Sequence, residues 1–456
     1  MVYDLIILGG GPAGYIAAER AGHFGKKVLL IEKNNLGGVC LNEGCIPTKT
    51  LLYSSKLKDS AANGKKYGVE TAEVLLNHKR VLARKSKTIK KLVAGIKMQL
   101  DKCSVEIIEG EGYIERKTDE GFKISVDGNI YLGNHLLIAT GSSTIIIPIE
   151  GMDKAIEDGF AITNKEVLEL KDIPEKMAVV GGGVIGLEIA SYFQSAGSQV
   201  TIIEMLDKIG GNIDEEIAEI LKSECEKQGI EFVLGAKVSK IENSRVYYEK
   251  DGDTNEIICD KALLSVGRRA NISGYGLENL NVETDKGIIT NDEMKTNIDG
   301  VYAAGDVTAA LMLAHVAYRQ AEVAVNNILG IKDNMEYSAI PSVIYTNPEV
   351  ASVGISKKQA DDIGMETIEK SISMNYSGRY MAENEAGQGI AKIIVQKHSS
   401  KLIGVQIIGS YASEIIYGAG IMIEQGMTTK DIKRQVFPHP TVAEIIREAV
   451  FMIDEE

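Results

Sequence analysis

Short apolar runs alternate with helical patterns along the first two thirds of the chain. Residues 4–8 form an apolar run, residues 13–24 carry apolar side chains at helical spacing, and residues 27–32 form a second apolar run. A short run that is apolar on both faces is typical of a strand buried in a parallel sheet. The order therefore predicts a strand–helix–strand unit.

The same pattern returns 172 residues later along the chain. There, residues 177–180 and 200–204 read as strands and residues 188–196 read as the helix between them. Other predicted elements are antiparallel strands within 109–126, buried strands at 135–142, 262–268 and 301–306, and a helix at 312–329.

From about residue 337 the pattern changes to one that predicts an α+β unit. Its predicted strands are 343–346, 390–396 and 402–409, and its predicted helices are 412–425 and 442–452.

Residues 73–102 predict a long amphipathic helix. Its apolar stripe consists of Leu82, Ile89, Val93, Ile96 and Leu100, and lysines and arginines cover its other faces. We interpret this basic surface as a solvated face, because the net charge of −14 argues against a nucleic-acid partner.

Length and cysteine content narrow the class of protein further. A chain of 456 residues is too long for one ordinary core, and no run approaches the 18 apolar residues of a membrane span. The N-terminus lacks a basic segment and reads as a strand, not as a signal peptide. Five cysteines do not form a disulfide framework, so we expect a reducing compartment, the cytoplasm.

Glycine clusters follow the first strand of both repeated units. Gly9-x-Gly11-x-x-Gly14 and Gly181-x-Gly183-x-x-Gly186 each precede the predicted helix, and an acid, Glu32 or Glu204, stands 23 residues after the first glycine. Such turns let the backbone approach a pyrophosphate at a helix N-terminus, and the acid accepts from a ribose 2′-OH. The chain is therefore expected to bind two dinucleotides, and Glu204 favours NAD over NADP at the second site.

Two cysteines, Cys40 and Cys45, lie in a glycine-rich segment just before Pro47, which opens a helical pattern. A helix N-terminus favours a thiolate at Cys45, so we interpret the pair as a redox disulfide. A structural bridge and a metal site are the alternatives, although the second ligand pair of a metal site is absent.

Three further residues have two interpretations each. His439 stands between two prolines and suits a general base, with Glu444 as the carboxylate that orients it. Glu444 also suits a capping box with Thr441. Asp306, at the end of a predicted strand, suits either a hydrogen bond to a cofactor hydroxyl or a helix cap.

These motifs resemble the pyridine nucleotide–disulphide oxidoreductases of the glutathione reductase type over essentially the full length. Residues 40–49, 181–188, 303–306, 312–315 and 439–441 carry the resemblance. It implies an α/β fold with two Rossmann-like dinucleotide-binding domains, for FAD and NAD, and a C-terminal α+β dimerisation domain. The expected boundaries are 1–144 and 270–336 for the FAD-binding domain, 145–269 for the NAD-binding domain and 337–456 for the dimerisation domain.

The resemblance also implies roles for individual residues. Cys40 would exchange with a substrate dithiol, and Cys45 would lie against the flavin, near a Lys49–Glu188 ion pair. In a homodimer, His439 would reach the disulfide of the other subunit. The expected FAD contacts are Gly9, Gly11, Gly14, Glu32, Lys49, Gly112, Thr140, Gly141, Ser142, Glu188, Asp306, Met312, Leu313, Ala314 and His315. The expected NAD contacts are Gly181, Gly183, Ile185, Gly186, Glu204, Val238 and Gly267.

The implied activity reoxidises dihydrolipoamide to lipoamide, with electrons passing through the Cys40–Cys45 disulfide and FAD to NAD. The implied partner is a lipoyl-bearing protein of a 2-oxoacid dehydrogenase or glycine cleavage complex, and no metal or membrane is expected. The alternatives are a reductase of a small disulfide such as glutathione, or a catalytically silent structural subunit. Four departures from the family pattern bear on the pH profile: Thr48, Ala270, Phe437 and Ala443.

Overall fold

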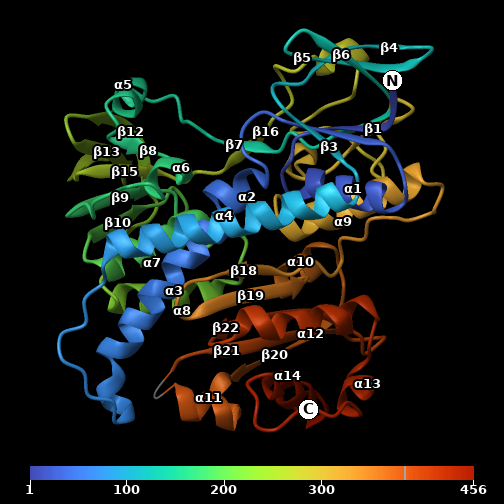
Figure 1. The fold of residues 1–456 in the computed structure, drawn as a ribbon. Helices are drawn as coiled ribbons and strands as arrows, with labels where there is room; N and C mark the ends of the chain where they lie inside the picture. The colour runs from blue at the N-terminus through green and yellow to red at the C-terminus, as the bar shows by residue number, and fades with distance from the viewer. Residues whose placement is uncertain (385–386, 456) are drawn as a thin grey trace.

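The fold is built from three large sheets with their helices, and two small antiparallel sheets, in a computed structural model that describes residues 1–384 and 387–455. Figure 1 shows the first sheet beside the N-terminus, the second to its left and the third below, next to the C-terminus. The first two sheets are wholly or largely parallel and the third is antiparallel, which confirms the predicted α/β class with a C-terminal α+β unit.

The first sheet has seven strands and draws them from two distant parts of the chain. Its order is β3-β2-β1-β6-β5-β4. Strand β17 also pairs with β6, along the edge that faces away from β1. Leu136 of β6 lies between Ile6 of β1 and Val301 of β17, so the segment after residue 300 returns to the N-terminal sheet. The strands are β1 (Val2–Leu8), β2 (Val28–Glu32), β3 (Glu106–Glu109), β4 (Tyr113–Thr118), β5 (Gly121–Val126), β6 (Asn129–Ile138) and β17 (Val301–Ala303).

Helices α1 (Pro12–His23), α4 (His78–Lys102) and α9 (Ala314–Ile328) pack on the first sheet. Ala17 of α1, Leu100 of α4 and Val323 of α9 share one buried cluster with Leu5 of β1. Two further helices, α2 (Gly38–Glu43) and α3 (Cys45–Ala62), leave this unit toward the second sheet, as Figure 1 shows.

The second sheet repeats the parallel core of the first. Its order is β11-β10-β9-β15-β8, and Val179 of β9 pairs with Ile202 of β10 and Leu263 of β15. A three-stranded antiparallel sheet, β12-β13-β14, accompanies it, and its strands were not predicted. The strands are β8 (Ala161–Ile162), β9 (Lys176–Val180), β10 (Gln199–Ile203), β11 (Glu231–Val233), β12 (Lys237–Glu242), β13 (Arg245–Lys250), β14 (Asp253–Ile258) and β15 (Lys261–Leu264). The helices are α5 (Met152–Glu157), α6 (Asn164–Val167), α7 (Val184–Ala196) and α8 (Glu215–Lys227).

A two-stranded antiparallel ribbon joins the first two units. It consists of β7 (Ser142–Thr144) and β16 (Arg268–Ala270), the segments by which the chain leaves the first unit and comes back to it.

The third sheet has the order β18-β19-β22-β21-β20 and is antiparallel throughout. Strands β21 and β22 have the predicted bounds, whereas β19 and β20 were not predicted. The strands are β18 (Ser342–Ile344), β19 (Glu349–Gly354), β20 (Thr367–Ser373), β21 (Ile390–Gln396) and β22 (Leu402–Gly409). The helices are α10 (Lys357–Asp362), α11 (Gly378–Glu383), α12 (Ala412–Glu424), α13 (Thr429–Lys433) and α14 (Glu444–Phe451).

The basic helix corrects one expectation of the sequence analysis. Helix α4 begins at His78, where Asn77 caps it, and one of its lysines is not solvated. Lys85 is 1% exposed, and its ammonium donates to the Leu168 carbonyl and pairs with Glu169. The interpretation of a wholly solvated basic face was therefore wrong at Lys85, because this turn of α4 packs against the second unit.

None of the helices within the described ranges is long and apolar enough to cross a membrane.

Candidate active site

Each glycine turn brings a strand end and a helix N-terminus into close contact. A Cβ added at Gly14 would stand 1.8 Å from the Gly9 carbonyl oxygen, and one added at Gly186 would stand 2.2 Å from that of Gly181. Space is open where the turns face outward. Within the described chain no atom lies within 4 Å of a Cβ built at Gly183, and the nearest atom to one built at Gly11 is the Gly38 Cα at 3.7 Å. An open helix N-terminus with close-packed glycines behind it fits a dinucleotide pyrophosphate.

The two acids occupy equivalent positions beside these turns. Glu32 Oε2 accepts from the Gly10 amide at 2.6 Å, and Glu204 Oε2 accepts from the Gly182 amide at 2.6 Å. The second oxygen of each carboxylate accepts from an amide two residues later. Both carboxylates are thus fixed at a strand end, and their remaining lone pairs are free to accept from a ribose hydroxyl.

The two cysteines lie on consecutive helices. Cys40 is on α2 and Cys45 is the first residue of α3, so the glycine-rich segment is largely helical. Their Sγ atoms are 2.6 Å apart, so the two side chains are placed to form the expected disulfide. The hydrogen bond from Cys40 and the Lys49 ammonium lower the pKa of Cys45 to about 7, against the effect of burial. The same hydrogen bond and burial raise the pKa of Cys40.

An ion pair with a buried carboxylate stands one turn away from Cys45. The Lys49 ammonium donates to Glu188 Oε1 and Oε2 at 3.0 and 2.7 Å, and the Glu188 side chain is only 4% exposed. Lys49 comes from α3 and Glu188 from α7, so the pair joins the first and second units. The Tyr345 amide, from the third unit, donates to Glu188 Oε1 at 3.0 Å.

Asp306 belongs to a cluster that links the first unit to the connecting ribbon. Its Oδ2 accepts from the Ser142 hydroxyl at 2.5 Å, and Arg268 Nε donates to the same hydroxyl at 2.7 Å. Asp306 is the first residue of a short 3-10 helix whose N-cap position is Gly305, and its carboxylate turns to Ser142. Burial lowers the pKa of Arg268, and the charges of Asp306, Glu43 and Cys45 oppose that shift.

The other expected cofactor contacts are spread over the edges of both units. Thr140 and Gly141 are tied to Asn271, through the Thr140 hydroxyl and the Gly141 carbonyl. His315 Nε2 lies 2.8 Å from the Pro341 carbonyl, and burial lowers the pKa of the ring. The rest lie at Gly112 beside β2, at Ser142 in β7, at Met312, Leu313 and Ala314 at the start of α9, at Ile185 in α7, at Val238 in β12 and at Gly267 before β16.

Both proposed roles of Glu444 have a matching contact. Glu444 Oε1 lies 2.9 Å from His439 Nδ1, and Oε2 accepts from the Thr441 amide at 2.9 Å. The Thr441 hydroxyl donates to the Pro438 carbonyl, so the expected capping box is only half formed. The Thr441 amide, more than His439, holds the pKa of Glu444 below its usual range.

A single chain does not bring His439 to the cysteines. The His439 side chain is 77% exposed, in the connection between α13 and α14. Figure 1 shows that connection below the third sheet and α2 above it. A site that uses both groups therefore requires a second copy of the chain.

Sequence reasoning missed four residues near the cysteine pair. Arg268 and Tyr345 are described above, and neither stands in a motif that was singled out. The Tyr15 and Tyr318 hydroxyls lie 2.8 Å apart, and burial first and then the cysteine charges raise the pKa of Tyr318. Tyr15 directly follows Gly14, which is the one signal that pointed to it.

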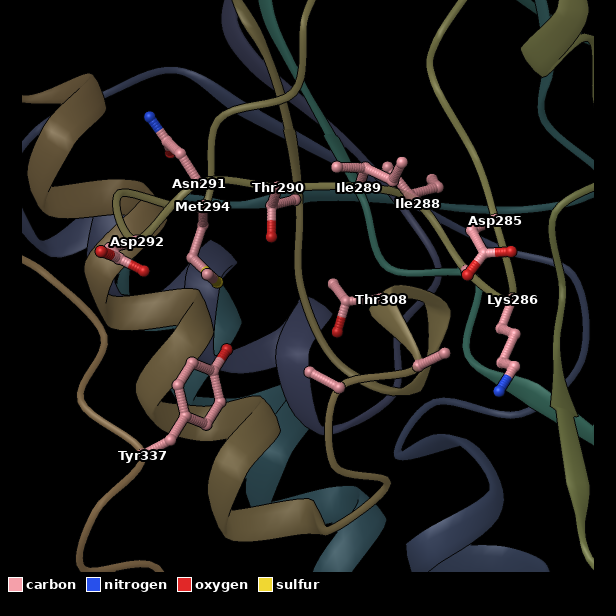
Figure 2. Close-up of a pocket in the computed structure, with 13 residues that line it drawn as sticks. Asp285, Lys286, Ile288, Ile289, Thr290, Asn291, Asp292, Met294, Thr308 and Tyr337 are labelled. Atoms are coloured by element: carbon pink, nitrogen blue, oxygen red, sulfur yellow. The ribbon is translucent and has the colours of Figure 1, made fainter. Parts of the chain in front are cut away.

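A separate pocket of about 330 Å³ lies behind the Asp306 turn. Figure 2 shows Thr308 and Tyr337 beside it, and both contact Gln320, whose Oε1 accepts from the Gly305 amide. The pocket contains neither the glycine turns nor the cysteines. Across the described residues, no group of three or more His, Cys, Asp or Glu side chains is arranged to hold a metal ion.

Comparison with known families assigns the two parts of the chain. The sequence model of the pyridine nucleotide-disulphide oxidoreductases matches residues 3–321. The model of the dimerisation domain of the same family matches residues 340–450. The chain therefore carries a dimerisation domain.

Curated relatives cover nearly the whole chain. A dihydrolipoyl dehydrogenase of Mycoplasma genitalium is 39% identical over 98% of both chains. A dihydrolipoyl dehydrogenase of Geobacillus stearothermophilus is 35% identical over 98% of this chain and 95% of its own. Among solved structures, LpdA from Mycobacterium tuberculosis is 26% identical with a TM-score of 0.89, over 98% of this chain and 99% of its own.

Proposed function

Because the chain belongs to the pyridine nucleotide–disulphide oxidoreductase family, we propose that it catalyses the dihydrolipoyl dehydrogenase reaction. The reaction oxidises dihydrolipoamide to lipoamide and reduces NAD. The observation that carries this proposal is the pair Cys40 and Cys45, at an Sγ–Sγ distance of 2.6 Å, in a chain that aligns with dihydrolipoyl dehydrogenases over 98% of its length.

The cofactors are FAD in the first unit and NAD in the second. The open spaces at Gly11 and Gly183 would receive the pyrophosphates, and Glu32 and Glu204 would accept from the ribose hydroxyls. Asp306, Thr140 and the 312–315 segment would add contacts to FAD. A bound flavin supplies two-electron transfer between a dithiol and a nicotinamide.

The cysteines divide the thiol chemistry between them. With the pair oxidised, a substrate thiolate attacks Cys40 Sγ, the Cys40–Cys45 bond breaks and Cys45 leaves as a thiolate. The second substrate thiol then displaces Cys40, so the substrate becomes a cyclic disulfide and the protein a dithiol. The low pKa of Cys45 makes it the better leaving group, and Lys49 stabilises its negative charge.

His439 supplies the base in this scheme. A thiol of ordinary pKa is mostly protonated at pH 7, and a neutral imidazole can accept that proton. Glu444 orients the ring through the contact between Oε1 and Nδ1. We propose a homodimer in which each His439 reaches the cysteine pair of the other copy, since one chain alone separates them.

The remaining assignments follow from this scheme. Residues 1–144 and 270–336 form the FAD-binding domain, 145–269 the NAD-binding domain and 337–456 the dimerisation domain. The pairing of β17 with β6 supports the return of the chain to the first domain. We place the protein in the cytoplasm, with a lipoyl-bearing protein of a 2-oxoacid dehydrogenase or glycine cleavage complex as its partner.

A direct assay tests the function. Purified, FAD-loaded protein is offered dihydrolipoamide or reduced glutathione, each with NAD or NADP, and nucleotide reduction is followed by absorbance. Only dihydrolipoamide with NAD should give fast turnover. Equal or faster turnover with glutathione would support the small-disulfide alternative, and no turnover with any pair would support a silent subunit.

A further inference from the structure

The ring of Tyr345 completes the environment of Lys49. The Lys49 Nζ lies 4.4 Å from the centroid of the Tyr345 ring, a distance at which a ring face attracts a cation. Tyr345 directly follows β18, so this aromatic group comes from the third unit and not from either nucleotide-binding unit. Its side chain is not deeply buried, because the residue is 38% exposed.

Tyr345 acts on the ion pair in two ways. Its backbone amide donates to Glu188 Oε1, and its ring faces the Lys49 ammonium that pairs with the same carboxylate. The amide contact would survive any substitution except proline, whereas the ring contact depends on the side chain. A substitution at Tyr345 therefore separates the two contacts.

The position of Lys49 matters because of where it lies on α3. Cys45 and Lys49 are four residues apart, on the same helix face, and the Lys49 charge lowers the pKa of Cys45. An ammonium that moves away from this place toward solvent would lose much of its effect on the thiolate.

We propose that Tyr345 is a positioning residue, whose ring holds the Lys49 ammonium beside Cys45 and so maintains the Cys45 thiolate at neutral pH. This inference deepens the proposed function and rests on its thiol chemistry. The third unit would then contribute Tyr345 to the cysteine site of its own chain, as well as His439 to the cysteine site of the other copy.

Other charged and titratable groups also surround Cys45. They are Cys40 on α2, Lys49 on α3, Glu188 on α7, Arg268 on β16, Tyr15 on α1, Tyr318 on α9 and Tyr345 itself. A substitution of Tyr345 leaves all the others in place, so a change in the Cys45 titration can be assigned to the ring and to the ammonium that it holds.

Two variants separate the ring from the hydroxyl. Tyr345→Phe keeps the ring, and over the described residues the Tyr345 hydroxyl has no hydrogen bond to lose. Tyr345→Leu removes the ring at similar volume. Both are made in a Cys40→Ser background, FAD-loaded and dimeric, so that Cys45 is the reactive thiol of the pair. Iodoacetamide alkylation of the Cys45 peptide is followed by mass spectrometry between pH 5 and 10, and FAD content and Tm are measured alongside.

The Tyr345→Leu protein should show a midpoint of Cys45 alkylation about 0.5 pH unit higher than its parent, as expected for the loss of an exposed cation–π contact. Tyr345→Phe should keep the parent midpoint. An unchanged or lower midpoint in Tyr345→Leu would overturn the proposal, as would a shift of equal size in Tyr345→Phe.

A third variant covers the case in which Tyr345→Leu does not fold. Tyr345→Trp presents the ring that attracts cations most strongly, so its midpoint should lie at or below that of the parent. A midpoint above the parent in well-folded Tyr345→Trp would overturn the proposal. No dihydrolipoamide enters these measurements, so their failure is distinct from a failure of the proposed function, which the turnover assay reports.

Discussion

At the scale of single residues, the cysteine pair shows how one hydrogen bond sets two opposite pKa shifts. Cys40 donates to Cys45, which favours the thiolate at Cys45 and keeps the proton on Cys40. The pKa of Cys45 lies near 7, below that of an ordinary thiol, so its thiolate persists to lower pH. Thiolate-dependent steps should therefore be lost only as the pH falls below about 7.

Removing the Cys40 thiol tests this assignment. Cys40→Ala should raise the pKa of Cys45, and Cys40→Ser should raise it less, because the serine hydroxyl can still donate a hydrogen bond. Both should lose dihydrolipoamide oxidation yet keep FAD and its reduction by NADH. Alkylation against pH and dye-linked NADH oxidation measure the two effects. Cys225→Ser, a buried thiol in another core, serves as the control and should change neither.

Glu444 offers a second test at this scale, because its two oxygens serve two different groups. His439→Gln should slow dihydrolipoamide oxidation by about 10²- to 10⁴-fold, the usual contribution of a general base. Glu444→Gln should fall between that variant and the parent. Steady-state turnover and Tm are measured together, with Glu448→Gln on the same helix as the control.

A lower Tm with unchanged turnover in Glu444→Gln would mean that Glu444 serves only to accept from the Thr441 amide and does not orient His439. Full activity in His439→Gln would contradict the proposed mechanism itself.

At the scale of elements, the two glycine turns have the same arrangement of strand, helix and acid. In both, an acid at the end of the second strand accepts from the amide of the residue after the first motif glycine, Gly10 or Gly182. The sequence predicts these units well, because the apolar period, the glycines and the acid depend only on local chemistry. The sequence does not predict helix α2, because glycines interrupt the helical pattern there. It does not predict β12 to β14 either, because the polar edge strands β12 and β14 lack a clear alternation of apolar and polar residues.

The contacts between units were beyond prediction for a different reason. Lys85, Arg268 and Tyr345 each act across elements that are far apart in sequence. Their side chains have no local pattern that distinguishes them from solvated residues, since burial is decided by packing that forms only in the complete fold. The predicted pairs Lys49–Glu188 and His439–Glu444 do lie in contact.

Because each glycine turn is assigned to a different cofactor, a substitution in one turn should weaken the binding of one cofactor only. Glu204→Ala should weaken NAD binding by about 10- to 100-fold, as expected for the loss of a hydrogen bond to a charged group, and leave FAD content unchanged. Glu32→Ala should lower FAD retention. Each variant is the matched control for the other, and KM for NAD and bound flavin per chain are the measurements. Equal loss of both cofactors in either variant would contradict the assignment of one turn to each.

At the scale of the whole molecule, the position of His439 makes the dimer part of the chemistry. Cys40→Ser and His439→Gln are each expected to be nearly inactive alone. In a mixed dimer one site carries both lesions and the other carries none, so co-expression at equal levels should restore about a quarter of parental activity, given the two-fold symmetry of a homodimer.

Activity of the co-expressed mixture and its sedimentation velocity provide the measurements. Recovery requires that each site draws on both chains. No recovery from a well-folded mixed dimer would mean that His439 serves the cysteines of its own chain or none.

Helix α4 has a mechanical consequence for the molecule. Its first half is anchored to the second unit by the Lys85 contacts and by His78, whose ring contacts Tyr192, and its last turn buries Leu100 in the core of the first unit. A helix of 25 residues is stiff over its length of about 37 Å, so it resists rotation of one unit against the other. Nicotinamide should therefore reach its place by local side-chain displacement and not by a hinge motion. Distances between spin labels on the two units should stay constant when NAD is added, and a lengthening or shortening would show that α4 bends.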